Sequence, residues 1–190
     1  MTVLPVTIWG EPVLHRRARE VEKFDDELRT LIADMFETNE AANGVGLAAP
    51  QVGVGKRIFI FKYANDDDAP DEGVLVNPVL TLSKIPGALP DPEEDVEGCL
   101  SFPGEHYPLQ RAEWARVQGF DGYGNPVDFV ATGWFARVMQ HEFDHLDGKL
   151  YVDRLADRYA KKAKKQAKKN GWGVPGLSWM PGVDPDPFGH

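Results

Sequence analysis

The sequence predicts one domain that combines helices with strands. Residues 25–42 and 134–147 space apolar side chains at helical intervals, whereas residues 57–63 and 74–82 are rich in the β-branched and aromatic residues typical of strands. The chain has 190 residues, 42% of them hydrophobic, which is the length of one domain and enough apolar mass for a core. We therefore expect residues 1–190 to form a single domain.

The amino-terminal part begins with a short segment, residues 8–14, in which Gly and Pro indicate a turn. A helix is expected to follow, with Asp25 or Asp26 as its N-cap and an end near Ala42. Its apolar side chains recur at helical spacing and are expected in the core: Leu28, Leu31, Ile32, Met35 and Phe36.

Two strands are predicted next, at residues 57–63 and 74–82. The second is interrupted by Asn77-Pro78, and because proline has no backbone N–H to donate, this pair suits an edge strand or a bulge. The acidic residues 65–73 and the proline-rich residues 83–95 are expected to be loops.

A hairpin and two helices complete the predicted chain. Residues 111–120 and 125–131 are typical of strands joined by the turn at residues 121–124. A helix without Pro or internal Gly is expected over residues 134–147, with Gly148 as its C-terminal stop. A basic helix is expected over residues 153–169.

The basic helix carries a charge opposite to that of the remaining chain. Residues 153–169 hold eight Lys or Arg and two Asp, a net +6, which leaves −15 on the rest of a chain whose net charge is −9. Its apolar side chains form a thin stripe at a spacing of four: Leu155, Tyr159, Ala163 and Ala167. The lysines then face outward, either as a solvated surface or as a contact for an anionic partner such as ribosomal RNA.

The carboxy-terminal residues 171–190 are rich in Gly, Pro and Trp, which predicts an irregular tail after Asn170-Gly171. Trp172 and Trp179 are the side chains expected to hold this tail against the body of the protein. The sequence leaves open whether the tail is ordered.

Composition and charge limit the compartments and partners that are expected for this protein. No run of about 18 apolar residues predicts a membrane span, and the first residues lack the basic and apolar regions of a signal peptide. Cys99 is the one cysteine, so no internal disulfide can form, which suits a reducing cytoplasm. The net charge of −9 argues against general nucleic-acid binding.

The strongest chemical signal is the sequence His-Glu-x-x-His at residues 141–145. His141 and His145 lie four residues apart, so on a helix they project from one face and can bind one metal ion. Glu142 lies beside them, where it can take a proton from a water molecule. Trp134 and Val138 continue the same face, as a pocket wall or simply as core.

A catalytic metal site usually has three protein ligands, so a third is required. Cys99, the one thiol, is a candidate, although a lone cysteine is usually an inert apolar side chain. Its position would bring the amide of Leu100 next to the metal, and Glu97 could accept a hydrogen bond from a ligand histidine or lie exposed. Asp153 would be the third ligand if the protein were a peptidase.

Residues 43–51 form a loop of small residues with two glycines, which allows a close approach of the backbone to another group. The loop lacks the lysine and hydroxyl of a phosphate loop. Gln51 offers an amide that could donate to a developing oxyanion, or it is an ordinary surface glutamine in a turn.

Three segments together resemble the motifs of peptide deformylase in order and spacing. They are residues 44–51 (GVGLAAPQ), 97–101 (EGCLS) and 140–148 (QHEFDHLDG). The resemblance extends from about Ile8 to Leu155, and the basic helix and tail are similar to those of a subset of bacterial members. It implies an α+β fold in which antiparallel sheets pack around a central metal-binding helix.

The resemblance also implies an activity, the removal of the N-formyl group from the initiator methionine of new polypeptides. It implies one divalent ion, Fe²⁺ in the cell with Zn²⁺, Ni²⁺ or Co²⁺ accepted, and it assigns roles to individual residues. These are Cys99, His141 and His145 as metal ligands; Glu142 as general base and then acid; Gln51 and the Leu100 N–H as oxyanion donors; the Gly46 backbone as peptide contact; and Val45, Trp134, Arg137 and Val138 as lining of the methionine pocket.

Two positions depart from that pattern. Glu105-His106-Tyr107 stands where many members have an arginine, which bears on contacts with the peptide and leaves the role of His106 open. Arg137 is polar for a methionine pocket, and we expect its aliphatic stem to line the pocket while its charge reaches water. The sequence also allows two other functions, a peptidase and a ribosome-binding module with an inactive metal site.

Overall fold

The computed structural model describes residues 2–64 and 69–189, and six of its strands, β3 to β8, follow one another along the chain between α1 and α2. The longer elements are α1 (Asp26–Ala41), β3 (Ile58–Lys62), β4 (Glu72–Leu82), β5 (Val96–Cys99), β6 (Phe102–Pro108), β7 (Trp114–Phe120), β8 (Pro126–Thr132), α2 (Gly133–Leu146) and α3 (Asp157–Lys169). The short strands are β1 (Val6–Thr7), β2 (Gly46–Ala48) and β9 (Ser178–Trp179). The fold is α+β, as expected.

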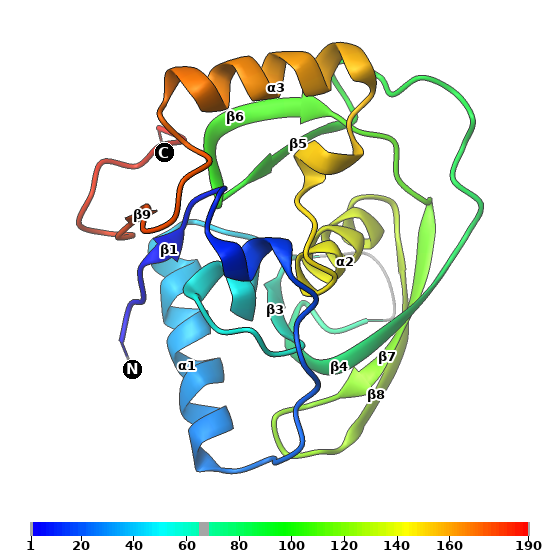
Figure 1. Ribbon diagram of the computed structural model, residues 1–190. Helices are drawn as coiled ribbons and strands as arrows, with labels where there is room; N and C mark the ends of the chain where they lie inside the picture. The colour runs from blue at the N-terminus through cyan, green and yellow to red at the C-terminus, as the bar shows by residue number, and fades with distance from the viewer. Residues whose placement is uncertain (1, 65–68, 190) are drawn as a thin grey trace.

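The helix α2 lies at the centre, with an antiparallel sheet on one side of it (Figure 1). This sheet has the strand order β2-β3-β4-β7-β8, and a separate hairpin is formed by β5 and β6. Phe135 and Met139 of α2 are fully buried against Phe59, Phe61 and Val117 of the sheet. Apolar burial therefore fixes the position of the helix that carries the histidines.

The helix α1 covers a second core. Asp25 caps it, since its side chain accepts a hydrogen bond of 3.0 Å from the Leu28 amide, as predicted. Leu28, Ile32 and Met35 are buried, whereas Leu31 and Phe36 are partly buried against the same core.

The strands predicted at residues 57–63 and 74–82 are present as β3 and β4, but β4 is an inner strand and not an edge. The pairing of β4 with β7 shifts between Val76 and Val79, so Pro78 lies in a bulge. Asn77 has a left-handed φ of 50°, and its side chain bonds the Val21 amide at 2.8 Å and the Val21 carbonyl at 2.9 Å. Part of the predicted acidic loop, residues 65–68, lies outside the described residues.

The basic helix begins later than predicted. Residues Tyr151–Arg154 form a 3₁₀ turn, in which the Asp153 carboxylate accepts from the Leu150 amide at 2.9 Å, and α3 starts at Asp157. The predicted apolar stripe of α3 is buried, while its six lysines are exposed. Among the described residues, no helix is long and apolar enough to cross a membrane.

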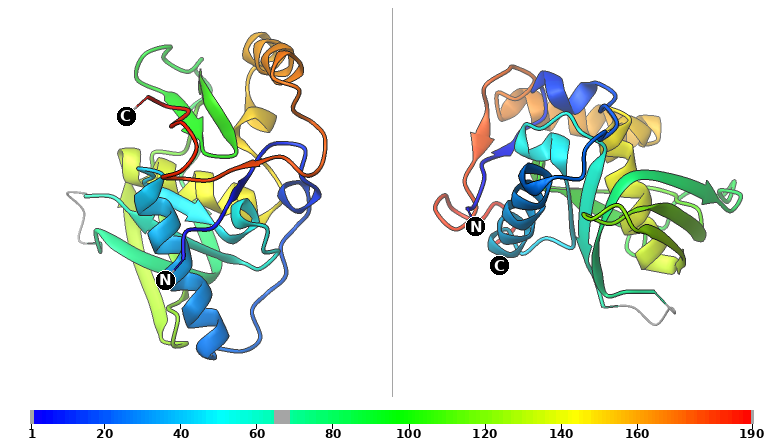
Figure 2. Two further views of the ribbon diagram at one scale, coloured as in Figure 1. Left: turned by 90° about the vertical axis from the view of Figure 1, so that its left-hand side faces the viewer. Right: turned by 90° about the horizontal axis from the view of Figure 1, so that it is seen from below.

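The tail runs beside β1 (Figure 2), and both tryptophans attach it to the body of the protein, as expected. Trp179 pairs with Val6 of β1, and its indole N–H donates to the Leu100 carbonyl at 2.9 Å. The Trp172 ring meets Phe102 edge-on, with centroids 4.9 Å apart. The tail therefore touches the segment that contains Cys99.

The end of α2 provides a test of the fold. Gly148 has a φ of 72°, and a Cβ there would lie 2.7 Å from the Arg16 backbone, whereas Gly171 has the same φ and nothing within 4 Å of such a Cβ. We expect Gly148→Ala to lower the free energy of unfolding by about 3 kcal/mol, from backbone strain plus overlap. Gly171→Ala should cost about 1 kcal/mol, from strain alone. Equal losses in urea unfolding would contradict this account.

Candidate active site

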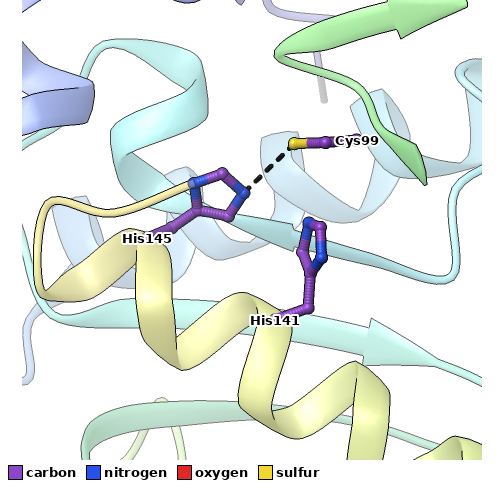
Figure 3. A group of neighbouring side chains, drawn as sticks. All are labelled: Cys99, His141 and His145. Atoms are coloured by element: carbon purple, nitrogen blue, oxygen red, sulfur yellow. Dashed lines mark hydrogen bonds between the residues drawn. The ribbon is translucent and has the colours of Figure 1, made fainter. Parts of the chain in front are cut away.

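The three predicted metal ligands meet in one buried cluster (Figure 3). Cys99 comes from β5, and His141 and His145 project from one face of α2. Their ligand atoms lie within 4.8 Å of one another, and Cys99 Sγ is 3.3 Å from His145 Nε2. Metal bonds of about 2.0–2.3 Å place tetrahedral ligands at comparable separations. The cluster can therefore hold one metal ion.

Asp153, the alternative third ligand of a peptidase, is not part of this cluster. It is exposed, and its carboxylate accepts from the Leu150 amide instead. The thiol is therefore the third donor near the two histidines.

Glu97 is buried and accepts from three side chains at once. Its carboxylate accepts from Arg111 Nε at 2.8 Å and Nη2 at 2.9 Å, from Arg137 Nη1 at 2.8 Å, and lies 3.0 Å from His141 Nδ1. Burial opposes its charge, but the Arg111 guanidinium and His141 outweigh it and hold the pKa of Glu97 below its usual range. A hydrogen bond from Nδ1 leaves His141 Nε2 available for a metal.

Glu142 is almost fully buried beside the cluster. Burial raises the pKa of Glu142 to about 7. Its Oε2 has no hydrogen-bond partner among the described residues, and a Cβ on Gly46 would lie 2.7 Å from its Oε1. A carboxylate with a free oxygen and a pKa near neutrality is suited to general acid–base chemistry. A side chain at position 46 would displace the Glu142 carboxylate.

Gln51 is 2% exposed, so the alternative of a surface glutamine is wrong. Its Oε1 accepts from the Ala48 amide at 2.8 Å, which fixes the orientation of the amide group. Its Nε2 then lies 3.7 Å from Cys99 Sγ and points toward the cluster. The side chain thus holds an N–H donor beside the metal ligands.

A cavity of about 220 Å³ opens onto this group. The predicted substrate residues Val45, Gly46, Trp134, Arg137 and Val138 all line it, together with Gln51, Leu100, Cys99, His141 and Glu142. Every residue predicted for the site therefore lines this cavity except His145, which belongs to the cluster with Cys99 and His141.

The expectation for the Arg137 charge is wrong. Its guanidinium does not reach water but is buried, with contacts of 2.6 Å to Asp95 and 2.8 Å to Glu97. It also lies 5.0 Å from the Trp134 ring, and Trp134 is 48% exposed, so Trp134 is not core. Arg137 therefore belongs both to the buried ion network and to the pocket wall.

The pairing of Arg111 with Asp144, which the sequence offered without a spacing argument, is present at 2.6 Å. Other site residues were not recognised in the sequence: Arg154 pairs with Asp144, and Asp95 pairs with Arg137. Phe188 of the tail lines the cavity. No local pattern marks these residues, because each meets the site from a distant segment.

This fold and site define a class, the metal-dependent hydrolases with a buried glutamate beside a Cys-His-His cluster. The family profile of polypeptide deformylase matches residues 3–161. The chain belongs to the polypeptide deformylase family. It is an enzyme that removes the N-formyl group from newly made polypeptides.

Curated relatives match over the whole chain. The peptide deformylases of Mycolicibacterium smegmatis and Mycolicibacterium paratuberculosis are 54% and 55% identical to it, with 100% of each chain covered. A crystal structure of a peptide deformylase from Legionella pneumophila has a TM-score of 0.75 at 36% identity, covering 89% of this chain and 95% of that one. One from Synechococcus elongatus, in complex with actinonin, has a TM-score of 0.73 at 39% identity and covers 92% of both chains.

The network around Glu97 can be tested against an exposed pair. Glu97→Ala leaves Arg111 and Arg137 buried without this acceptor, so we expect a loss of about 3–5 kcal/mol in the free energy of unfolding and metal affinity weaker by about 10- to 100-fold. Asp128→Ala removes an exposed partner of Arg116 and should leave the free energy of unfolding nearly unchanged. Urea unfolding and metal titration measure both, and similar values for the two variants would refute the argument.

Proposed function

We propose that Cys99, His141 and His145 hold one divalent metal ion and that Glu142, Gln51 and Leu100 carry out the hydrolysis of the formyl group. The supporting observation is the convergence of three metal-donor atoms within 4.8 Å beside a buried carboxylate with a free oxygen. The bound ion would polarise the formyl oxygen and lower the pKa of a water molecule.

Glu142 takes the proton of the water that attacks the formyl carbon. The negative charge that develops on the formyl oxygen accepts hydrogen bonds from Gln51 Nε2 and the Leu100 N–H, and each such donor contributes roughly 3 kcal/mol in comparable enzymes. Glu142 then transfers its proton to the leaving amine, which gives formate and a free amino-terminal methionine.

The cavity walls hold the peptide during this step. The Gly46 backbone bonds the extended peptide, and Val45, Trp134, Arg137 and Val138 surround the methionine side chain. A formyl carbon carries only hydrogen, so a narrow site excludes acetyl groups and internal peptide bonds by size. Residues 1–190 act as one catalytic domain.

We propose Fe²⁺ as the native ion, with Zn²⁺, Ni²⁺ or Co²⁺ as functional substitutes. The supporting observation is the donor set, because one thiolate with two imidazoles is soft enough for these ions and too soft for Mg²⁺ or Ca²⁺. The cytoplasm is the proposed location, where the unpaired Cys99 stays reduced.

Two substitutions separate metal binding from proton transfer. In anaerobically purified protein, we expect Glu142→Ala to keep its metal and to lose activity by about 100-fold or more, because the base is gone. Cys99→Ala should lose the metal as well as the activity.

The measurements are formate release from a formyl-methionyl peptide and metal content, with Asp128→Ala as the control for removing an exposed carboxylate. A Glu142→Ala protein at full rate would contradict the assigned base, and a Cys99→Ala protein with full metal would contradict the ligand set. If the parent, fully loaded with metal, released no formate, the proposed catalytic roles would be wrong.

We also propose that α3 makes a transient contact with the ribosome, where the formylated chains emerge. Its buried stripe docks the helix, so its six exposed lysines point away from the body of a chain with a net charge of −9. Such a cationic face attracts the phosphates of RNA by counterion release. The rest of the chain is acidic and is not expected to bind nucleic acids in general.

Charge reversal on α3 tests this contact. Lys164→Glu/Lys165→Glu should weaken co-sedimentation with ribosomes by about tenfold at low salt. Lys23→Glu/Lys84→Glu changes the net charge equally at exposed positions away from α3 and should have little effect. Both proteins should keep their activity on a short formyl-methionyl peptide. Equal weakening in the two would show that net charge, not α3, governs binding.

A further inference from the structure

The helix α1 ends at the wall of the catalytic cavity, since residues 42–46 line the cavity directly after it. Asn43 has a left-handed φ of 51°, and its amide donates to the Glu40 carbonyl at 3.1 Å. The Gly44 amide donates to the Asn39 carbonyl at 2.9 Å. These two hydrogen bonds form a Schellman motif, with asparagine in place of the usual glycine at the left-handed position.

Asn39 also bonds Gly44 with its side chain. Asn39 Nδ2 donates to the Gly44 carbonyl at 2.7 Å, so Asn39 holds both the N–H and the C=O of Gly44. In a Schellman motif these two positions frequently share an apolar contact, whereas here they share a hydrogen bond. A Cβ at Gly44 would lie 2.3 Å from Asn39 Oδ1, so the close approach depends on glycine.

Stability alone does not account for an asparagine at position 39. The residue is 1% exposed, and its Oδ1 has no hydrogen-bond partner among the described residues. A buried acceptor without a partner costs free energy, and asparagine favours a helix less than leucine or methionine does. An apolar side chain of similar size would avoid both costs. What asparagine adds is the hydrogen bond to the Gly44 carbonyl.

Gly44 leads into the strand β2, along which the peptide is proposed to bind. The Val45 carbonyl accepts from the Lys62 amide at 3.0 Å, and Gly46 pairs with Phe61 of β3. Within the described part of the chain, β3 is the one sheet neighbour of β2. Gly46 lines the cavity, so the second edge of β2 is available to the backbone of an extended peptide.

The same segment lies close to two residues of the proposed reaction. A Cβ at Gly44 would lie 3.3 Å from Leu100 Cδ1, and a Cβ at Gly46 would lie 2.7 Å from Glu142 Oε1. A shift of this segment would therefore move the bound peptide relative to the Leu100 N–H and the Glu142 carboxylate. The hydrogen bond from Asn39 to the Gly44 carbonyl opposes such a shift.

We propose that Asn39 is a positioning residue, which fixes Gly44 so that the free edge of β2 is preorganised for the peptide backbone. Asn39 is not among the residues that line the cavity, so it acts through Gly44 and not by touching the substrate. A contact that holds the peptide equally in the ground state and in the transition state changes KM and leaves kcat unchanged. This inference rests on the proposed function, because it assumes that the peptide binds along β2.

The experiment measures kcat and KM for formyl-Met-Ala-Ser with the metal-loaded parent and with Asn39→Leu. We expect KM to rise by about three- to tenfold, the effect of one hydrogen bond, and kcat to stay within about twofold. The urea midpoint should equal or exceed that of the parent, because the unpartnered Oδ1 is removed. Asn39→Ala removes the same donor without adding bulk, so it gives the same test if leucine disturbs the fold.

Thr38→Val is the matched control in the same turn of α1. Thr38 is 0% exposed, and its Oγ1 donates to the Asp34 carbonyl at 2.7 Å and accepts from the Leu4 amide at 2.9 Å. These bonds hold the amino-terminal segment and not the cavity wall. Thr38→Val should therefore lower the urea midpoint and keep the parent KM, the opposite of the pattern expected for Asn39→Leu.

A second measurement separates this inference from the proposed function. Calorimetric binding of the deformylated peptide Met-Ala-Ser needs no turnover. If the parent released no formate but Asn39→Leu bound this peptide about three- to tenfold more weakly, the catalytic roles would fail and the positioning role would stand.

Two results would overturn the positioning role. One is an unchanged KM and an unchanged peptide affinity in both Asn39→Leu and Asn39→Ala. The other is a fall in kcat and in the urea midpoint that matches Thr38→Val, which would mean that Asn39 only stabilises the fold.

Discussion

The carboxylate of Glu97 is the group on which the site depends most, because it is the buried acceptor shared by two arginines and a histidine of the proposed metal site. Arg111 and Arg137 bring positive charge into the interior, where an unpaired ion costs several kcal/mol. Glu97 compensates them and, in the same position, orients the His141 ring. The electrostatic stability of the core and the geometry of the metal site are therefore set by one side chain.

The ion pairs around Glu97 continue into other elements of the fold. Arg111 also pairs with Asp144 of α2, and Asp144 accepts from Arg154 in the 3₁₀ turn that leads to α3. Asp95, just before β5, pairs with Arg137. The ion pairs thus connect α2, the strand of Cys99 and the start of the carboxy-terminal region, which keeps three metal donors from two distant segments in register.

The cavity also depends on glycines at positions where the backbone lies very close to another side chain. Gly46 leaves room for the Glu142 carboxylate, and Gly98 leaves room for the His106 ring. In each place a Cβ would lie within 3 Å of a side chain in the site. The Glu142 carboxylate and the His106 ring can therefore lie close to the backbone that lines the cavity.

The sequence by itself determined the features that local geometry controls. His141 and His145 lie one helical turn apart, so their spacing alone placed them on one face with Glu142 beside them. The strands, the hairpin and the cap at Asp25 followed from equally local patterns. Cys99 and Gln51 were assigned by resemblance to a family, because their own surroundings left an inert thiol and a surface turn as alternatives.

Only the tertiary structure decided where long-range partners meet. It turned the Arg137 charge inward toward Glu97, made Asn77-Pro78 a bulge in an inner strand, started α3 four residues after Asp153, and brought Phe188 to the cavity. The inward charge, the bulge and the position of Phe188 depend on burial and on partners from distant segments. Periodicity and spacing describe neighbours along the chain, so they carry no information about which charge will find a buried partner or which end of the chain will line a cavity.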